Sequence, residues 1–439
     1  MSQINNTTYS FKEAIELMRG FINGYTFSET VKRFEIKVHA IDQLDWLDAQ
    51  QASTKIYGSN QEDSTAIAGI GEAVGLSGGG KPDFKKIFIK LRKYLDPQFP
   101  FLQWYGGFCF DYKSMDHSWN GFETWRFILP RFELARDGDK MIFCCNLIGN
   151  LGIDHMLKEL DKIKEPVARK ALPLNVIKRS DIPKSSKWHE NVDKVLAQIQ
   201  QGECQKVVLA RKTDLTFKET INPWDILKTL KKVTPNSYHF AFQLSGNVFL
   251  GASPERLYKR RGRKIISEAL AGTKPSTAVS KDLINSSKDR HEHQLVVQAI
   301  TRDLTPLCKE LTGEQEPKIR ELTNGIHLHT EFAGTLKDDV NDEDILQALH
   351  PTPAVGGTPK EIALISIRRM EAFGRGWYAG PLGYVGLDWA EFVVGIRSGF
   401  IKGKKLSVYA GAGIVEGSRA ADEWDEVENK ISNFIKIVK

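Results

Sequence analysis

Three pairs of short apolar runs, each joined by a tight glycine turn, constrain the fold of this chain more than any other feature. HFAFQLSGNVFLGAS turns at Ser245-Gly246-Asn247, RLYKRRGRKIISEAL turns at Gly262, and VVGIRSGFIKGKKLSVYAGAG turns near Gly403. Glycine reaches the positive φ values that such turns require, and two-residue turns join antiparallel strands. The sequence therefore predicts antiparallel sheet in its second half.

Two amphipathic helices are predicted between and after these hairpins. Residues 287–311 (SKDRHEHQLVVQAITRDLTPLCKEL) and 421–438 (ADEWDEVENKISNFIKIV) carry apolar residues at helical spacing. Hairpins combined with separate helices are typical of α+β (mixed α/β) architecture and argue against a doubly wound parallel sheet. The polar, proline-containing segment 164–187 is interpreted as a connector between an N-terminal region, 1–163, and a C-terminal region, 188–439.

Composition and charge narrow the class of protein. The formal net charge is +6 over 439 residues without a long basic block, which argues against a nucleic-acid partner. No run of about 18 apolar residues could span a bilayer, and no basic segment followed by an apolar run opens the chain. We therefore expect a cytoplasmic location and no membrane partner. The five cysteines form no CxxC pair and are expected to be reduced core residues: Cys109, Cys144, Cys145, Cys204 and Cys308.

Two motif-like segments are better explained without a ligand. GLSGGGKP at residues 75–82 nearly matches a phosphate-binding loop, but it ends in proline where a magnesium-binding hydroxyl is needed, so a mobile glycine loop is expected. The pairs His291/His293 and His327/His329 have no cysteine near them, and residues two apart lie on different faces of a helix. Structural zinc is therefore not expected.

Two acidic pairs could bind a hard cation. Asp289 and Glu292 share one face of the first predicted helix, and Glu423 and Glu426 repeat this spacing on the last, with Lys430 one turn later. Carboxylate oxygens without cysteine suit Mg²⁺, which takes few protein ligands. On spacing alone, two solvated acidic faces are the commoner explanation of such pairs, and both interpretations stay open at this point.

An ordered series of motifs extends from about residue 188 to the end of the chain. The region resembles the chorismate-utilising enzymes, which include isochorismate, salicylate, anthranilate and aminodeoxychorismate synthases. The N-terminal segments LDWLDAQ, KIYG, AIAGIG, WYGGFCFD and ILPRFEL are similar to isochorismate synthases of the menaquinone type. The motifs are KVVLAR (from Lys206), FLGASPERL (Phe249), EALAGT (Glu268), SKDRHEH (Ser287), LHPTPAVGGTPK (Leu349), GWYAGPLGYV (Gly376), GIRS (Gly395), YAGAGIVEGS (Tyr409) and EWDEVENK (Glu423).

The resemblance implies a fold and a reaction. The family fold, shared with anthranilate synthase component I, is one large domain of antiparallel sheets with helices outside and the active site in a deep cleft, so the N-terminal region is expected to belong to the same fold. In the isochorismate branch, water adds at C2 of chorismate while the C4 hydroxyl leaves. By this resemblance, Lys206 is the base that activates water and Glu255 is the acid on the leaving oxygen.

The resemblance also implies the binding residues. Mg²⁺ would be bound directly by Glu292 and Glu426, while Asp289 and Glu423 would hold its waters, and the ion would hold the ring carboxylate of chorismate. Tyr378 and Arg397 resemble the family's clamp on the enolpyruvyl carboxylate. The remaining predicted substrate-binding residues line the ring pocket, allow close backbone approach or add positive charge: Gly272, Thr273, His327, Ala354, Gly411, Gly413 and Lys430.

Three positions favour one branch of the family. Lysine at 206, where ammonia-using members carry glutamine, favours water as the nucleophile. Ala271 stands where aminodeoxychorismate synthases often carry a nucleophilic lysine. Ala354 stands where salicylate synthases tend to carry threonine. The resemblance therefore implies isochorismate synthase, an isomerase for menaquinone biosynthesis, without a glutamine amidotransferase subunit. The alternatives are a salicylate synthase, a siderophore-pathway isochorismate synthase or an inactive paralogue, and monomer and homodimer both stay open.

Overall fold

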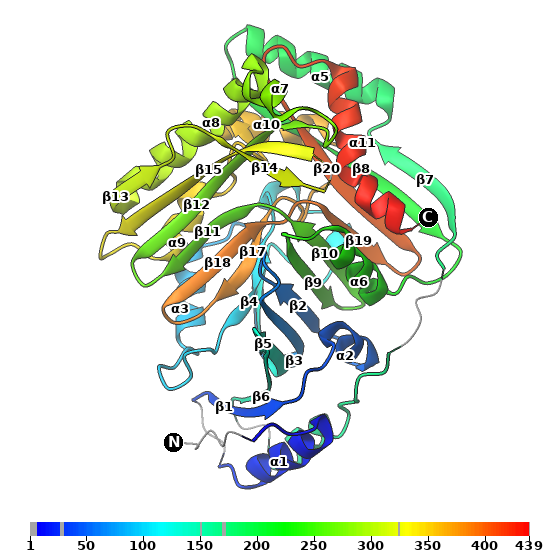
Figure 1. Ribbon diagram of the computed structural model, residues 1–439, viewed down its shortest axis with the longest axis vertical. Helices are drawn as coiled ribbons and strands as arrows, with labels where there is room; N and C mark the ends of the chain where they lie inside the picture. Colours follow the sequence, from blue (N-terminus) through cyan, green and yellow to red (C-terminus); the bar gives the residue numbers. More distant parts are fainter. Residues whose placement is uncertain (1–6, 27–29, 150–151, 169–172, 324, 439) are drawn as a thin grey trace.

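One continuous antiparallel sheet organises the protein (Figure 1). The computed structural model describes residues 7–26, 30–149, 152–168, 173–323 and 325–438. Four strands from the N-terminal region lie in the middle of the sheet and pair in the order β2–β3–β5–β4. These strands are β2 (Lys55–Ser59), β3 (Thr65–Gly78), β5 (Trp125–Asp137) and β4 (Trp104–Phe108).

Two series of strands, here called the first and second arms, continue the sheet from this centre. The first arm begins where β9 pairs with β2, and the second begins where β17 pairs with β4. The first arm contains β9 (Tyr238–Leu244), β10 (Asn247–Ser253), β19 (Ser398–Lys402), β20 (Lys405–Ile414) and β8 (Lys206–Phe217), flanked by β7 (Val176–Ile182) and β16 (Gly357–Thr358). The second arm contains β17 (Pro381–Val385), β18 (Trp389–Val394), β11 (Arg256–Arg261), β12 (Lys264–Lys274) and β15 (Gly325–Leu336), flanked by β13 (Cys308–Gly313) and β14 (Lys318–Leu322).

The remaining strands extend this sheet, and the helices lie around it (Figure 1). β6 (Lys140–Leu147) and β1 (Lys32–Val38) extend it from the second half of β5. Helix α8 contacts β12 and β15, α11 contacts β20, and α6 contacts β9 and β10. The helices are α1 (Phe11–Asn23), α2 (Gln43–Ala49), α3 (Phe84–Arg92), α4 (Ile153–Leu160), α5 (Ser185–Gln200), α6 (Pro223–Val233), α7 (Ser280–Ile284), α8 (Ser287–Leu304), α9 (Asp342–Leu349), α10 (Lys360–Met370) and α11 (Ala420–Ile437).

The three predicted hairpins are confirmed. They are β9–β10, β11–β12 and β19–β20, and their turns contain Ser245 and Gly246 at φ 50° and 80°, Gly262 at 57° and Gly403 at 59°. These positive φ values are the reason that the turns need glycine or a small residue. The antiparallel sheet flanked by helices therefore agrees with the predicted α+β fold.

Two predictions from the sequence need correction. The helix predicted over 287–311 ends at Leu304, because Pro306 lacks the amide that would continue the helix, and Cys308–Gly313 forms β13 instead. The segment interpreted as a connector includes strand β7, which pairs with β8. Strand β3 continues through Gly78 against β5, so the first half of the expected glycine loop is sheet. The division of the chain at 163 and 188 stays a prediction.

Aromatic packing fixes the N-terminal region onto the C-terminal strands. The buried ring of Trp119 lies 5.2 Å from Phe249, 4.5 Å from Phe400 and 5.9 Å from Tyr409, measured between ring centroids. A side chain at Gly376 would collide with the Trp119 ring, so glycine permits this contact. All five cysteines are buried and unbridged. Among the described residues, no helix combines the length and the apolar character needed to cross a bilayer.

Candidate active site

The first arm supplies a buried lysine that faces a carboxylate of α8. Lys206, the first residue of β8, is fully buried, and its Nζ lies 2.9 Å from Oε1 of Glu292. This contact lacks the alignment of a hydrogen bond, so Nζ retains donor capacity. On the neighbouring strand β20, a Cβ at position 413 would collide with Glu292 Oε1 and lie 2.7 Å from Lys206 Cε. Gly413 therefore leaves the space in which these two side chains meet.

Helix α11 supplies a second lysine–carboxylate pair. Lys430 Nζ lies 2.6 Å from Glu426 Oε1 and donates a hydrogen bond to the carbonyl of Gly411 on β20, at 2.8 Å. One turn earlier on α11, Glu423 is buried and its Oε1 accepts a hydrogen bond from Lys288 of α8 at 2.6 Å. The predicted acidic faces of α8 and α11 thus share one partly buried, mixed-charge region instead of facing solvent.

Burial and mutual repulsion shift the pKa values of two of these carboxyls upward. For Glu423, burial and then the charge of Glu426 raise the pKa above its usual value. For Asp289, burial is again the largest cause, with the charge of Glu292 also raising the pKa, while Lys274 lies 3.7 Å away. A cation bound between these carboxyls would relieve the repulsion and favour their ionised forms.

The predicted acid, Glu255, lies in the short link between β10 and β11 and is 3% exposed. Burial is the main cause that raises the pKa of Glu255 to about 8, and the charge of Glu268 adds to it, while Lys206 and Lys430 oppose it. Most Glu255 carboxyls are therefore protonated at neutral pH, as a proton donor requires. Glu255 thus lies within electrostatic range of the lysines of β8 and α11.

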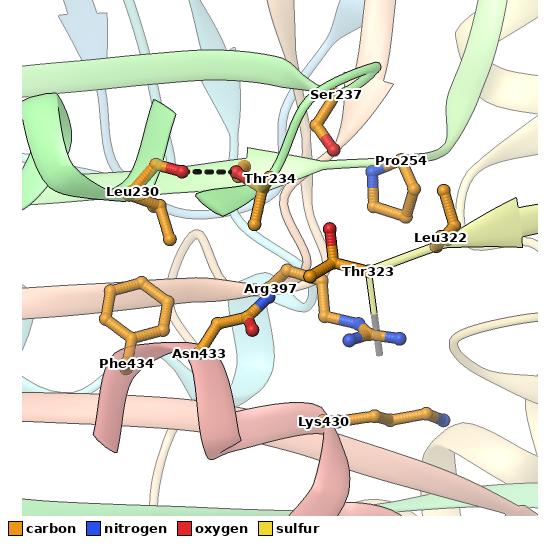
Figure 2. A pocket seen from close by; sticks show the side chains of 11 residues that line it. Leu230, Thr234, Ser237, Pro254, Leu322, Thr323, Arg397, Lys430, Asn433 and Phe434 are labelled. Atoms are coloured by element: carbon orange, nitrogen blue, oxygen red, sulfur yellow. Dashed lines mark hydrogen bonds between the residues drawn. The ribbon is translucent and has the colours of Figure 1, made fainter. Parts of the chain in front are cut away.

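A pocket beside these residues is lined by two cations (Figure 2). It contains about 380 Å³ of space, part of it open to solvent, and Figure 2 shows the charged ends of Arg397 and Lys430 on the same side of it. Arg397 has φ 51°, a strained value for a long side chain, and is half-buried. Burial lowers the pKa of Arg397 to about 10, although the negative charge of Glu426 raises it, so Arg397 stays charged at neutral pH. Pro254, next to Glu255, also lines this pocket.

The second arm supplies a neutral histidine. His327 on β15 is buried, and its Nδ1 lies 2.9 Å from the Thr273 hydroxyl on β12. Burial is the main cause that holds the pKa of His327 well below its usual value, and the charges of Arg397 and Lys430 add to it. Its Nε2 has no hydrogen-bond partner among the described residues. Gly272, at φ 75°, brings β12 close to the backbone of Asp289.

The predicted tyrosine lies against β20. Tyr378 is buried and stacks on Tyr409 at 5.2 Å between ring centroids, and burial raises the pKa of its hydroxyl, which therefore stays protonated. A Cβ on Gly411 would lie 3.2 Å from this hydroxyl. Ala354 is less directly placed. It packs, partly buried, against the hydrophobic core, and its loop leads into β16, which pairs with β8 at Lys206.

Sequence reasoning missed several charged partners. Lys288 and Lys274, which neutralise the acidic groups, and Arg320, which pairs with Glu268, were not singled out. Lys288 and Glu268 both lie inside motifs used above, so motif membership was a signal for these two. No local pattern indicates Arg320, because its partner lies 52 residues away on another strand.

Fold and site together define a chorismate-binding enzyme, and comparison agrees: the chain belongs to the family described as chorismate binding enzyme, whose model matches residues 26–439. It is similar to isochorismate synthase MenF of Haemophilus influenzae, with 30% identity, 97% of this chain and 96% of that protein covered. The solved structure of MenF, the menaquinone-specific isochorismate synthase of Escherichia coli, superposes with a TM-score of 0.87 at 28% identity, covering 98% of this chain and 99% of that one. Anthranilate synthase component I of Streptococcus pneumoniae shares the fold, with a TM-score of 0.73, 20% identity, and 86% and 92% covered.

The donor set fits a hard divalent cation of the kind that chorismate-utilising enzymes need. Four carboxylates face four lysines, and two of those carboxyls have raised pKa values. Their oxygen atoms are the donors that Mg²⁺ prefers. With the lysines in their present contacts, no three acidic, histidine or cysteine side chains of the described residues are close enough to hold an ion together.

Proposed function

We propose that this protein is an isochorismate synthase that converts chorismate to isochorismate, for menaquinone biosynthesis, with Lys206 as base and Glu255 as acid. The observation that carries the proposal is the pairing of a buried lysine on β8 with a buried carboxyl whose pKa is about 8. Water loses a proton to Lys206 as its oxygen bonds to C2, the ring double bonds shift, and the C4 hydroxyl leaves as water with the proton of Glu255. The net reaction is an isomerisation, because one water enters and one leaves.

The cations of the pocket support a dianionic substrate. Arg397 can bind a carboxylate through two parallel hydrogen bonds, and the protonated Tyr378 hydroxyl can donate a third. The neutral His327 can offer its Nε2, which has no hydrogen-bond partner in the described part of the chain, toward the ring. We assign Gly272, Thr273, Gly411, Gly413 and Lys430 to the ring pocket. Ala354 stays a prediction, as do the cytoplasmic location, the oligomeric state and the absence of an amidotransferase partner.

Mg²⁺ is the proposed ion, held by Glu292 and Glu426 directly and by Asp289 and Glu423 through water. When bound, it would fix the ring carboxylate of the substrate and balance its charge. For these residues to reach the ion, Lys206 must give up its contact with Glu292 and Lys430 its contact with Glu426.

Removal of the metal should stop turnover. Excess chelator is expected to abolish isochorismate formation, and added Mg²⁺ should restore it, because the ring carboxylate of the substrate would lose the ion proposed to fix it. Independently of activity, Mg²⁺ at about 100 times its dissociation constant should stabilise the fold by about 2.7 kcal/mol. Calorimetry at several pH values should find weaker binding at low pH, because protons compete for Glu423 and Asp289. Unchanged rates in excess chelator would contradict a metal role.

A methyl group at position 413 should disrupt the site without unfolding the protein. Gly413→Ala places a Cβ against Glu292 Oε1 and Lys206 Cε, so both charged ends must move. We expect turnover to fall by about 10²-fold, the loss typical of a small misplacement of reacting groups. Gly79→Ala is the matched control, because nothing lies within 4 Å of its Cβ position, and it should retain full activity. Equal rates for the two variants would argue against the proposed site.

A product assay tests the function directly. Purified protein is incubated with chorismate and Mg²⁺ without ammonium, and the products are separated by chromatography. Isochorismate alone is the expected result. Salicylate with pyruvate would instead place the protein among the salicylate synthases and remove the role given to Ala354. A preparation that binds Mg²⁺ but leaves chorismate unchanged would indicate an inactive paralogue.

A further inference from the structure

A second buried carboxyl, which the proposed reaction does not use, lies beside Glu255. Glu268 on β12 is 4% exposed and accepts three hydrogen bonds. Its Oε1 accepts from the backbone amide of Arg256 at 2.6 Å, and its Oε2 from Arg320 Nη1 of β14 at 3.1 Å. Nε2 of His329, on β15, lies 3.1 Å from the same Oε2. A buried carboxyl with this many donors is held in one orientation.

The first of these hydrogen bonds reaches the peptide that follows Glu255. The amide of Arg256 belongs to the Glu255–Arg256 peptide bond, so Glu268 fixes that peptide from one side. From the other side, the amide of Val394 donates to the Glu255 carbonyl at 3.1 Å, and the amide of Glu255 donates to the Ser253 hydroxyl at 3.3 Å. Glu268 is therefore part of the frame that aims the Glu255 side chain.

The surroundings of these two carboxyls favour opposite protonation states. Burial opposes ionisation of Glu268, but His329, Arg320 and the Arg256 amide outweigh it and lower the pKa of Glu268. For Glu255, burial and then the charge of Glu268 raise the pKa to about 8. At neutral pH the Glu268 carboxyl is ionised and the Glu255 carboxyl holds a proton. Glu268 can therefore act as a fixed negative charge and Glu255 as an acid.

We propose that Glu268 is a positioning residue that orients Glu255 and, through its fixed negative charge, keeps the Glu255 carboxyl protonated for the reaction. The inference rests on the proposed function of Glu255 as the acid. The charged groups that act on Glu255 come from four elements: Glu268 of β12, Lys206 of β8, Lys430 of α11 and Arg320 of β14. The three cations favour loss of the proton. Burial opposes them most strongly, and Glu268 is the charged group that adds to the effect of burial.

The test is the pH dependence of kcat/KM in Glu268→Gln relative to wild type. The amide oxygen of glutamine can still accept from Arg256, but the charge is gone and Arg320 loses its partner. If the pKa of Glu255 then falls by about two units, kcat/KM should be about ten-fold below wild type at pH 7 and less than about two-fold below it at pH 5.5. The ratio of the two kcat/KM values depends on the protonated fraction of Glu255. Protonation of Lys206 cancels in this ratio because both proteins contain that residue. A ratio that is constant with pH would overturn the proposal.

Three variants control this measurement. Glu268→Asp keeps the charge, so its ratio to wild type should not change with pH, even if the shorter side chain lowers the rate. Glu331→Gln removes an exposed carboxylate opposite Glu268 on β15 and should match wild type at every pH. If Glu268→Gln does not fold, Arg320→Gln takes its place. Arg320→Gln removes a cation that favours ionisation of Glu255. The kcat/KM of this variant divided by that of wild type should therefore increase with pH, and a decrease would contradict the proposal.

A stability titration tests the inference without any turnover. The pKa of Glu255 is about 8 in the folded state and about 4.3 in the unfolded state. Wild type should therefore lose stability relative to Glu255→Gln as the pH rises from the lower pKa to the higher one. This loss should end near pH 8 in the wild-type background and near pH 6 in the Glu268→Gln background. Equal end points would refute the role of Glu268. Different end points in a protein that makes no isochorismate would refute the proposed function alone.

Discussion

Lys206→Ala is expected to lower the turnover of chorismate by about 10⁴-fold while the fold survives. General bases typically contribute 10²–10⁴-fold, and the upper end is expected because Lys206 is fully buried, where water cannot readily replace it as the base. The fold should persist because the charges of Lys430 and Lys288 still act on Glu292, which loses its closest cation. The measurement is kcat at saturating chorismate and Mg²⁺, with circular dichroism as the check on folding.

Two further observations make this result specific. Lys212→Ala removes another lysine of β8, paired at 4.0 Å with Asp214, and should leave turnover nearly unchanged. Small primary amines should partly restore Lys206→Ala, because the deleted side chain leaves room for a replacement base. Wild-type rates in Lys206→Ala would remove the residue from the mechanism, and the proposed reaction would need another base.

Glu255→Gln should bind chorismate with nearly wild-type affinity and convert it about 10²–10⁴-fold more slowly. Glutamine resembles the protonated carboxyl in shape and charge, so binding is preserved, but it has no acidic proton for the leaving oxygen. In wild type, the protonated fraction of Glu255 should decrease as pH rises through about 8, and this loss should disappear from the profile of the variant. Single-turnover kinetics separate binding from chemistry and provide the measurement.

The matched control is Glu331→Gln, the same chemical change on an exposed residue of β15. A near-wild-type rate for Glu255→Gln would show that the proton comes from elsewhere. A large loss of affinity with unchanged kcat would assign Glu255 to binding instead of proton transfer.

Local signals explain which parts of the fold could be predicted. The hairpins β9–β10, β11–β12 and β19–β20 were predictable because their turns contain glycine between apolar runs, and α11 was predictable from its spacing. The contacts of β2 with β9 and of β4 with β17 join segments far apart in sequence, and such pairing leaves no local pattern. The helix predicted over 287–311 is too long because the apolar spacing continues past Pro306, whereas the helix ends at Leu304.

The site residues likewise include some that a local sequence pattern indicates and others that it does not. The pair Glu426–Lys430 follows from helical spacing, because the residues are one turn apart on α11. The roles of Lys206 and Glu255 came from motif resemblance, since neither spacing nor composition indicates that these residues are buried. The link from Glu268 to Arg320 depends on three strands meeting in space, so it needed the structure.

The central position of β2–β5 in the sheet has a consequence for any shortened form of the protein. Among the described strands, the ladder from the first arm to the second passes through these four N-terminal strands. A fragment that begins at residue 188 would leave β9 and β17 with unpaired amides and carbonyls along one edge each. Such edges recruit strands of other molecules, so the fragment should aggregate when expressed alone. Truncated gene products or an internal start codon would therefore yield insoluble protein instead of a smaller enzyme.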